Sequence, residues 1–451
     1  MPRSIIPALI ATLLLSLAPG TASARIVGAY TVMASEGGSV ARVLTDEAQC
    51  PPIRIGGKPR PMSERASPRT IASRTSAADG SVIPAASFPL RVCEAPIARG
   101  THSASVAGRA LPLPRAVIAR IVVIGDTGCR LKDSSKSYQA CNDKRTWPFA
   151  RIARAAAARH PDLVLHVGDY EYRESPCPQG MSGCAGSPSG YGWAAWSADF
   201  FTPAAPLLAA APWALVRGNH EECARAGAGW WLLLDPHPLV AGADCADPAQ
   251  FFAGNHTPPY AVELGGKARI IIADFAAIGE KPFASAEKLA RYRGDAAAIV
   301  SLAQAGDSNF VADHYPFGAV TDSAKGGEQI GYPSIAQAFD AKDGVPSLPN
   351  VAAVLAGHVH LLQYAALAGH PAQLVAGFSG TQEDEPPAPA DAQGTQALTL
   401  PAGLALSDLT TSYGHFGYVV LTRKPHGAWA MTAYDQSGKI LLSRLIPARA
   451  E

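Results

Sequence analysis

Residues that commonly ligate metals follow five apolar segments of this 451-residue sequence, each at the point where its segment ends. In chain order they are Asp126, Asp169, Asn219 with His220, His314, and His358 with His360. Carboxylate, amide and imidazole groups, with one carboxylate available to two cations at once, form the ligand set of a two-metal hydrolytic site. The pattern therefore predicts a dinuclear metal centre.

This interpretation depends on the combination of motifs. Gly-Asp pairs also occur at 294–295 and 306–307, where no apolar run precedes them and a turn is the simpler interpretation. The pairs at 125–126 and 168–169 differ because each ends an apolar run. A His-x-His sequence in an extended segment places both imidazoles on one side, about 6 to 7 Å apart, within reach of neighbouring metals. Two surface histidines would explain that motif alone, whereas five motifs in this order indicate one site.

The apolar runs before these residues are typical of buried strands. Those at 121–124 and 163–167 flank the segment 148–159, which begins with Pro and ends before His160-Pro161, a pattern typical of a helix. Together they predict a βαβ unit. Further buried strands are expected at 213–216, 269–273, 309–312 and 351–356. Because open α/β sheets bind ligands at the carboxyl ends of their strands, we expect the polar residues to converge on one edge of one sheet.

The segment before this core has a different sequence pattern. From 25 to 115 the sequence offers only short extended runs, which predict a small β-rich domain or an extension packed on the main one. Within it, the stretch 54–74 carries six cations and one acid among Pro and Ser. A solvated loop is favoured there over an arm for a phosphate-rich partner, because no aromatic residues are interleaved.

Segments after the βαβ unit complete the expected fold. A helical period fits 285–305, and the last segments predict a meander with strands at 417–422, 428–434 and 439–445. The Pro/Ala-rich stretch 379–398 predicts a mobile loop.

The first 24 residues resemble a signal peptide. One cation, Arg3, precedes an apolar run of 14 residues from Ile5 to Ala18, and Ala22-Ser23-Ala24 forms a small-x-small cleavage site. Spanning a bilayer takes roughly 20 apolar residues, so a cleaved signal is favoured over an anchor. No comparable run follows, so we expect a secreted or periplasmic protein without a membrane span.

The charge balance excludes other classes of protein. The chain has 38 basic and 37 acidic residues, and loss of Arg3 makes the two numbers equal. With 48% apolar residues, this balance argues against a disordered chain and against a generally basic nucleic-acid binder. The sequence leaves the oligomeric state open.

All eight cysteines follow the predicted cleavage site, which fits disulfides formed in an oxidising compartment. No CxxC pair indicates a zinc ribbon. Connectivity cannot be derived from an even number of cysteines. Short separations favour local bridges, which leaves the two most N-terminal cysteines for each other: Cys129–Cys141, Cys177–Cys184, Cys223–Cys245 and Cys50–Cys93.

The motifs resemble, in order, the five motifs of purple acid phosphatases within the calcineurin-like metallophosphoesterases. They are Gly125-Asp126-Thr127-Gly128, Gly168-Asp169-x-x-Tyr172, Gly218-Asn219-His220-Glu221, Val311-x-x-His314 and Gly357-His358-x-His360. The resemblance spans about half of the chain and implies an α/β fold, a four-layer sandwich of two mixed sheets flanked by helices, after a small β-rich N-terminal region. The domain plan is then a signal peptide at 1–24, a β-rich domain or extension at 25–115, and a metallophosphoesterase domain at 116–451.

The resemblance also implies metal ligands. Asp126, Asp169, Tyr172 and His360 would surround Fe(III), and Asp169, Asn219, His314 and His358 would surround a divalent Zn, Mn or Fe ion, with Asp169 bridging the two. Many members of the superfamily have Asp-x-His at the first motif, whereas Gly128 stands at the histidine position here. The phenolate of Tyr172 can replace that histidine, and this hard donor favours trivalent iron. Tyr170 is a rival, and Tyr172 is preferred because its spacing from Asp169 matches the family.

The activity implied by the resemblance is hydrolysis of phosphorylated small molecules. A metal-bound hydroxide would attack a phosphate monoester, and His220 would stabilise the transition state or protonate the leaving oxygen. Orientation of a metal ligand is the alternative role for His220. The segment 315–318 lacks the further histidines that some family members use toward substrate. Two other functions stay open: a phosphodiesterase using the same centre, and a binding protein that presents the tripeptide Arg293-Gly294-Asp295.

Overall fold

The computed structural model describes residues 25–76, 80–240, 242–322, 328–384 and 404–448. The predicted signal peptide at 1–24 lies outside the described residues, and so does the part of the predicted 379–398 loop from residue 385 onward.

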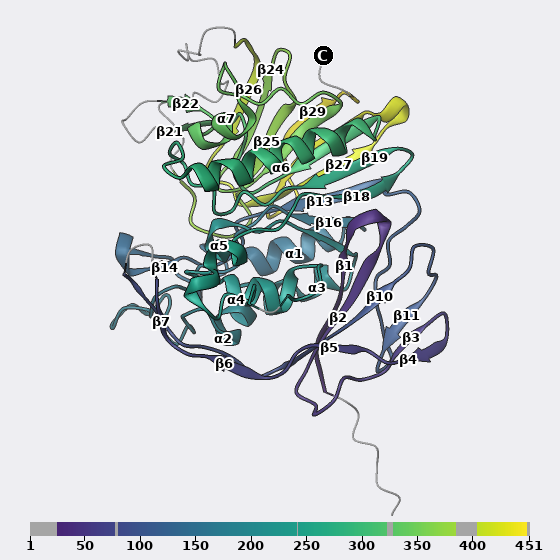
Figure 1. Ribbon diagram of the computed structural model, residues 1–451, viewed down its shortest axis with the longest axis vertical. Helices are drawn as coiled ribbons and strands as arrows, with labels where there is room; N and C mark the ends of the chain where they lie inside the picture. Colours follow the sequence, from purple (N-terminus) through teal and green to yellow (C-terminus); the bar gives the residue numbers. More distant parts are fainter. Residues whose placement is uncertain (1–24, 77–79, 241, 323–327, 385–403, 449–451) are drawn as a thin grey trace, which may run out of the picture.

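Two large β-sheets pack face to face in the middle of the molecule, and helices cover the outer face of each sheet (Figure 1). This is the four-layer α/β sandwich that the motifs predict. The larger sheet has ten strands, in the order β29 (Ile440–Ile446), β28 (Trp429–Asp435), β27 (Gly417–Arg423), β13 (Arg120–Ile124), β16 (Leu163–His166), β17 (Trp213–Leu215), β1 (Ile26–Met33), β2 (Ser39–Thr45), β10 (Arg91–Ile97) and β5 (Ser63–Ala66). The smaller sheet has seven strands, in the order β18 (Tyr260–Gly265), β19 (Ala268–Ile272), β20 (Ser308–Ala312), β23 (Val351–Ala356), β25 (Ala372–Ala376), β24 (Leu362–Leu367) and β26 (Leu406–Ser412).

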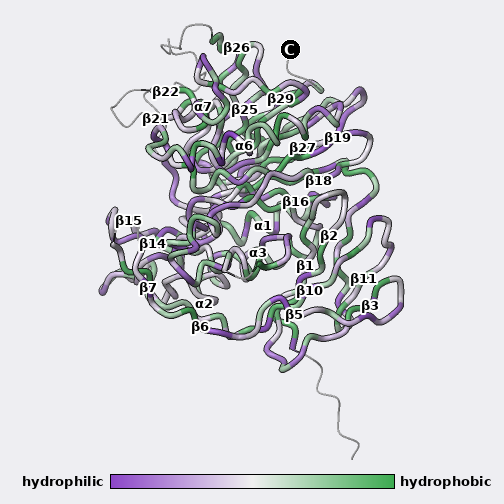
Figure 2. Tube along the Cα trace, in the orientation of Figure 1, coloured by the Kyte–Doolittle hydropathy of each residue, from purple (hydrophilic) through white to green (hydrophobic). Residues whose placement is uncertain are grey.

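Alternation along the central strands explains why they are apolar throughout. In β13, Val122 and Ile124 pack toward the helices, whereas Ile121 and Val123 pack between the two sheets. Both faces of such a strand are buried, so no polar position interrupts the apolar run. Figure 2 shows the same distribution, with hydrophobic residues along the interior strands and hydrophilic residues in the outer turns.

Helices supply the two outer layers. The larger sheet is covered by α1 (Phe149–Ala157) and α3 (Thr202–Leu208), beside the shorter α2 (Trp193–Trp196), α4 (Gly227–Gly229) and α5 (Phe251–Gly254). The smaller sheet is covered by α6 (Ala286–Gln304) and α7 (Pro333–Phe339). The helices expected at 148–159 and 285–305 are therefore α1 and α6. Within the described residues, helices that combine the length and the hydrophobicity needed to cross a bilayer are absent.

The N-terminal region continues the larger sheet. β1 lies parallel to β17, with Val32 opposite Trp213, and β2 and β10 extend the sheet beyond β1. A separate four-stranded sheet packs nearby, in the order β12 (Arg109–Ala110), β11 (Ala104–Val106), β3 (Ile53–Ile55) and β4 (Lys58–Arg60). Short paired strands complete the region: β6 (Arg69–Ile71) with β9 (Ala86–Phe88), and β7 (Arg74–Thr75) with β8 (Val82–Ile83).

The predicted solvated loop at 54–74 is wrong in its lack of regular structure and at Arg65, whereas Arg54, Lys58 and Arg60 are exposed as expected. Strands β3 to β6 lie within or across this stretch, and Arg65 is buried. Its guanidinium donates to the carbonyl oxygen of Trp231 at 2.6 Å and pairs with Glu94 at 3.0 Å. A cation-rich composition indicates solvation only when tertiary partners are absent, and here those partners come from distant segments.

The four disulfides are those expected: Cys50–Cys93, Cys129–Cys141, Cys177–Cys184 and Cys223–Cys245. Three of them lie beside the loops that carry the candidate ligands. Cys129 follows the loop of Asp126, and Cys223 follows that of His220. These bridges restrict the conformation of loops that lie outside the helices and strands.

Candidate dinuclear metal site

The candidate ligands project from the carboxyl ends of strands in both sheets. The loops after β13, β16 and β17 of the larger sheet carry Asp126, Asp169 and Asn219. The loops after β20 and β23 of the smaller sheet carry His314 and the pair His358 and His360. The expectation of one edge of one sheet is therefore corrected: the site lies between two sheets whose parallel strands end at the same side of the sandwich.

On one side of the site, the hydroxyl of Tyr172 lies among three candidate ligands. It is 2.7 Å from Asp169 Oδ2, 2.9 Å from Asp126 Oδ1 and 3.0 Å from His360 Nε2. Tyr172 and Asp126 are completely buried. A phenol, two carboxylates and an imidazole thus converge on one point.

On the other side, Asn219 joins two histidines. Its Oδ1 atom is 3.0 Å from His314 Nε2 and 3.1 Å from His358 Nδ1. His314 Nε2 is also 3.3 Å from Asp169 Oδ2. The Asp169 carboxylate therefore contacts both groups of donors, which is the position of a shared ligand. Ligand atoms of Asp126, Asp169 and His314 all lie within 4.8 Å of one another.

The two tyrosines after Asp169 point in different directions. The hydroxyl of Tyr170 donates to the carbonyl oxygen of Val216 at 2.9 Å, and its ring stacks on His166 with centroids 3.8 Å apart. Tyr170 is therefore part of the packing between β16 and the helices. Of the two, Tyr172 alone has its hydroxyl among the candidate ligands.

The backbone is strained where the ligands leave their strands. Asp126, Asp169 and His358 have φ values of 54°, 59° and 71°, in the left-handed region that side chains other than glycine rarely adopt. Such conformations persist only where the surroundings enforce them, and they cluster at functional sites. Gly168 has a φ of 98°, and a Cβ atom there would lie 2.5 Å from the His314 ring, so glycine is required for the close approach.

Gly128 stands where many members of the superfamily have histidine, and it fits no larger residue. A Cβ atom at this position would lie 2.8 Å from both the Tyr172 backbone nitrogen and Asp199 Oδ2. The absence of a histidine and the presence of Tyr172 are thus two aspects of one packing arrangement.

His220 follows Asn219, and both residues line one cavity. The Nδ1 atom of His220 is 3.1 Å from both the carbonyl oxygen of Glu171 and Glu174 Oε1. Two acceptors at Nδ1 hold the proton there, which leaves Nε2 directed toward Asp169 Oδ2 at 3.7 Å. The imidazole ring also packs on Tyr172, with centroids 3.8 Å apart.

Electrostatics in the site couple these groups. Burial opposes ionisation of Asp169, but the charges of His314 and His220 hold its pKa well below the ordinary range. Burial also opposes protonation of His314, yet Asp169 raises the pKa of this histidine to about 10. Burial raises the pKa of Tyr172 well above its usual value, and Asp126 and Asp169 add to that effect. A cation bound here displaces these protons, so its affinity rises with pH.

Several residues that support the site were given no role by the sequence motifs. Buried Glu221 accepts backbone hydrogen bonds from Asp169, Tyr170 and Gly218, and its position beside His220 was a usable signal. Asp384 Oδ2 lies 3.1 Å from His360 Nδ1, and Glu280 Oε1 lies 3.3 Å from His358 Nε2. Neither carboxylate follows an apolar strand, so only the tertiary structure reveals them.

A polar cavity of about 460 Å³ opens onto these residues. The cavity is lined by candidate ligands, by His220 and by neighbouring side chains. The complete lining is Arg130, Asp169, Asn219, His220, Glu280, Thr321, Tyr332, His358, Val359, His360 and Asp384. This volume suits a small molecule.

The two sheets form a sandwich, and carboxylate, amide, imidazole and phenol donors lie between the ends of their strands. This arrangement defines a dinuclear metallohydrolase fold. The sequence profile of the family described as calcineurin-like phosphoesterase matches residues 119–362, more than half of the chain. The chain belongs to this family.

One solved structure supports the fold. The purple acid phosphatase PPD1 isolated from yellow lupin (Lupinus luteus) seeds is 13% identical, with 94% of this chain and 74% of that chain covered and a TM-score of 0.57. A structure of PhoD is 14% identical, with 93% of this chain and 92% of that chain covered and a TM-score of 0.48. A search of curated proteins found no match. The predicted resemblance to a purple acid phosphatase-like metallophosphoesterase is confirmed.

Proposed function

We propose that this protein is an exported phosphatase that hydrolyses phosphate monoesters at a dinuclear metal centre. The observation that carries the proposal is the position of the Tyr172 hydroxyl, within 3.0 Å of Asp126, Asp169 and His360, the last two of which line a polar cavity. Membership of the phosphoesterase family supports ester hydrolysis. The monoester preference, the identity of the metals and export go beyond that membership and are the proposal itself.

The donor set fits two cations of different hardness. Asp126, Asp169, Tyr172 and His360 would hold Fe(III), because a phenolate and carboxylates are hard donors. Asp169, Asn219, His314 and His358 would hold a divalent Zn, Mn or Fe ion. The close approach of these buried donors supports the assignment, since like-charged carboxylates need a cation or protons between them.

Bound at such a site, a pair of metal ions supplies a nucleophile from water near neutral pH and offsets the charge of the phosphoryl oxygens. Orientation of the substrate and proton transfer to the leaving oxygen then fall to the protein's own residues. His220 is held through Nδ1 by Glu174 and the Glu171 carbonyl, so its Nε2 atom can approach a phosphoryl oxygen or the leaving oxygen. Burial and the positive charge of Arg225 lower the pKa of His220 well below its usual value, so the proton that such a step needs would be favoured only by the negative charge of a bound substrate.

The direct test is hydrolysis of an aryl phosphate by the mature protein loaded with iron and zinc or manganese. Activity that falls at least about 100-fold in His220→Ala, with metal content unchanged, is the expected result. A folded, metal-loaded protein without activity on the monoester contradicts the proposal. Faster turnover of a bis-aryl phosphate identifies the phosphodiesterase instead.

The metal assignment has its own test with a matched control. Tyr172→Phe and Tyr170→Phe each remove one buried hydroxyl, and only that of Tyr172 lies among the candidate ligands. We expect a tyrosinate-to-iron absorption band that Tyr172→Phe abolishes and Tyr170→Phe retains. Zinc alone and a colourless protein contradict the iron assignment.

The non-catalytic alternative has less support. In the tripeptide Arg293-Gly294-Asp295, Asp295 is buried on α6 and lies 2.9 Å from His256 Nε2. A recognition tripeptide needs an accessible carboxylate, which this side chain does not offer.

The domain plan and the compartment belong to the same proposal. A signal peptide at 1–24, an extension at 25–115 and a catalytic domain at 116–451 would deliver the enzyme to a secreted or periplasmic location. Four disulfides are consistent with that compartment. N-terminal sequencing of the exported protein tests the cleavage after Ala24.

A further inference from the structure

Arg130 stands out among the cations around the cavity because it has no carboxylate partner in the described part of the chain. Lys132 and Arg225 both lie against Glu174, and Arg173 pairs with Asp199. Arg130, which lines the cavity, contacts only rings: its guanidinium lies 5.4 Å from the Tyr172 ring centroid and 2.9 Å from His360 Nδ1. Its Nε atom is buried and has no hydrogen-bond partner.

The contact with His360 does not satisfy the hydrogen-bond donors of the Arg130 guanidinium once His360 serves as a metal ligand. Asp384 Oδ2 lies 3.1 Å from His360 Nδ1, so the ring proton belongs on Nδ1 and is donated to that carboxylate. The lone pair of Nε2 faces Tyr172 and Asp126 and is the one available to a metal. Neither ring nitrogen then accepts from Arg130, whose guanidinium is left without an acceptor among the described residues beside the cavity that Arg130 lines.

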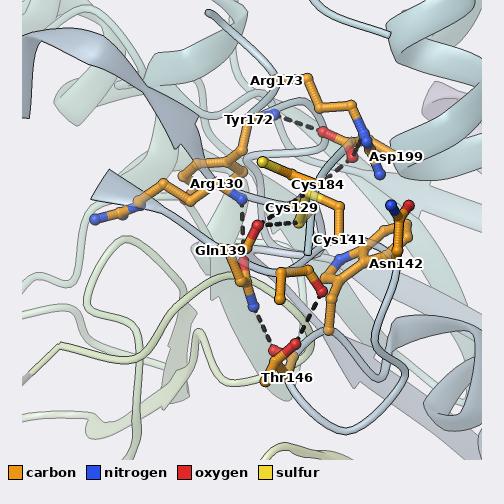
Figure 3. The surroundings of a disulfide bond; sticks show 12 residues. Cys129, Arg130, Gln139, Cys141, Asn142, Thr146, Tyr172, Arg173, Cys184 and Asp199 are labelled. Carbon is orange, nitrogen blue, oxygen red and sulfur yellow. Dashed lines mark hydrogen bonds and ion pairs between the residues drawn. A yellow bond between two sulfur atoms is a disulfide. The ribbon is translucent and has the colours of Figure 1, made fainter. Parts of the chain in front are cut away.

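The position of Arg130 is built by the disulfide loop that contains it. Cys129 and Cys141 form the bridge, and between them the Arg130 N–H donates to Gln139 Oε1 at 3.0 Å while the Arg130 carbonyl accepts from the Gln139 N–H at 2.8 Å. Figure 3 shows this loop, with Arg130 beside Tyr172 and Gln139. Because its backbone is anchored in this way, Arg130 gives up less conformational freedom on binding a ligand.

A guanidinium with unused donors, next to the candidate metal ligands, matches the geometry of a phosphoryl group. Arginine binds two oxygens of a phosphate at once, in short charge-assisted hydrogen bonds. The sequence lacks the histidines that some family members use toward substrate after His314, and residues 315–318 supply no cation in their place. Among the described residues that line the cavity, Arg130 is the one lysine or arginine.

We infer that Arg130 is a substrate-binding residue that recognises the dianionic phosphoryl group of the substrate. This inference rests on the proposed phosphatase function and adds the residue that selects the charge of the substrate. A phosphate monoester carries a dianionic group with oxygens free for a bidentate contact, whereas a diester carries a single negative charge. Arg130 therefore favours monoesters and retains the phosphate product.

The test measures binding of inorganic phosphate to the metal-loaded mature protein by calorimetry, alongside metal analysis. Arg130→Gln is expected to raise the Kd of phosphate about 10- to 100-fold without loss of metal. Arg130→Lys keeps the charge but not the bidentate geometry, so its Kd is expected between those of Arg130→Gln and the parent.

Lys136→Gln is the matched control. Lys136 lies in the same disulfide loop, carries the same charge and is exposed beside Asp133. Its loss is expected to leave the Kd of phosphate unchanged. Three results overturn the inference: an Arg130→Gln variant that binds phosphate as the parent does, an equal effect of Lys136→Gln, and loss of metal from Arg130→Gln.

Failure of the inference is separable from failure of the proposed function. A parent protein that neither binds phosphate nor hydrolyses an aryl phosphate contradicts the proposed function itself. An active parent whose Arg130→Gln variant prefers diesters no more than the parent does contradicts only the role of Arg130.

Discussion

The carboxylate of Asp199 accepts a hydrogen bond of 2.8 Å from the backbone N–H of Tyr172. Its other oxygen accepts one of 3.1 Å from the backbone N–H of Cys129. Asp199 is completely buried on a π-helical turn (Ser197–Phe201) and pairs with Arg173. One side chain thus anchors the loop after Asp126 to the loop of Tyr172, and π-helical turns often mark functional positions.

Replacement of Asp199 by asparagine should affect both stability and metal content. The variant leaves Arg173 buried without its partner, which costs about 3 kcal/mol of unfolding free energy. It also places an amide N–H against backbone donors, so the Tyr172 loop shifts and bound iron falls. Denaturant unfolding and metal analysis measure the two effects.

Asp162→Asn is the control for this prediction. Asp162 also accepts two backbone hydrogen bonds, from Ala119 and Arg120, and pairs with exposed Arg115 away from the site. It should lose stability and keep its metals. Full metal content in Asp199→Asn would disprove the positioning role of Asp199.

Gly128→Ala should disrupt the site because the added Cβ overlaps the Tyr172 backbone and Asp199. We expect a loss of about 2 kcal/mol or more in unfolding free energy, together with weaker metal binding. Thermal unfolding with and without a chelator measures both.

Gly294→Ala makes the same chemical change where the structure has room. Gly294 lies inside α6, and nothing lies within 4 Å of an added Cβ. This variant should gain about 1 kcal/mol, since alanine is the better helix former. Equal effects of the two variants would rule out the packing explanation.

Removal of the Cys129–Cys141 bridge should alter phosphate binding as well as stability. The double serine variant loses about 3 kcal/mol for its 12-residue separation, and the Cys50–Cys93 variant about 4 kcal/mol for its 43-residue separation. The phosphate Kd should rise only in the first, because that loop holds Arg130. Urea unfolding and calorimetry on both variants check the prediction, and a raised Kd in the second contradicts it.

A pH dependence is expected from His237, which lies away from the metal site. Burial lowers its pKa, but the hydrogen bond and charge of Asp235, whose Oδ1 is 3.2 Å from His237 Nδ1, outweigh burial and raise it. A raised pKa means that the protonated form stabilises the fold. This stabilisation is complete below about pH 6.5, the ordinary histidine value, and is lost as the pH rises through the folded-state value.

The measurement compares His237→Gln with the parent protein by urea unfolding at pH 5.5 and at pH 9. The variant should be more strongly destabilised at pH 5.5. A larger deficit of His237→Gln at pH 9 would reverse the predicted sign.

Local patterns predicted the central elements and the β-rich character of the N-terminal region, but not the burial of Arg65 within that region. The strands at 121–124 and 351–356 and the helix at 285–305 follow from apolar runs and from helical period. Such signals depend on neighbouring residues alone. The stretch 54–74 was expected to be solvated, whereas Arg65 is buried by carbonyl groups from residues 231 and 237. The composition of this stretch does not predict those partners, because they lie far away in the sequence.

The sequence by itself determined the chemistry of this protein: the donor types, their order after buried strands, and a tyrosine in place of a histidine. These properties are local, because each motif lies within a few residues of its strand. The tertiary structure decided which sheets carry the ligands, that Tyr172 rather than Tyr170 faces them, and that Arg130, Asp199 and Asp384 belong to the site. Those relationships join residues far apart in the chain, as in the Arg130 contact with His360 across 230 positions. Contacts across such distances arise only when the sheets pack.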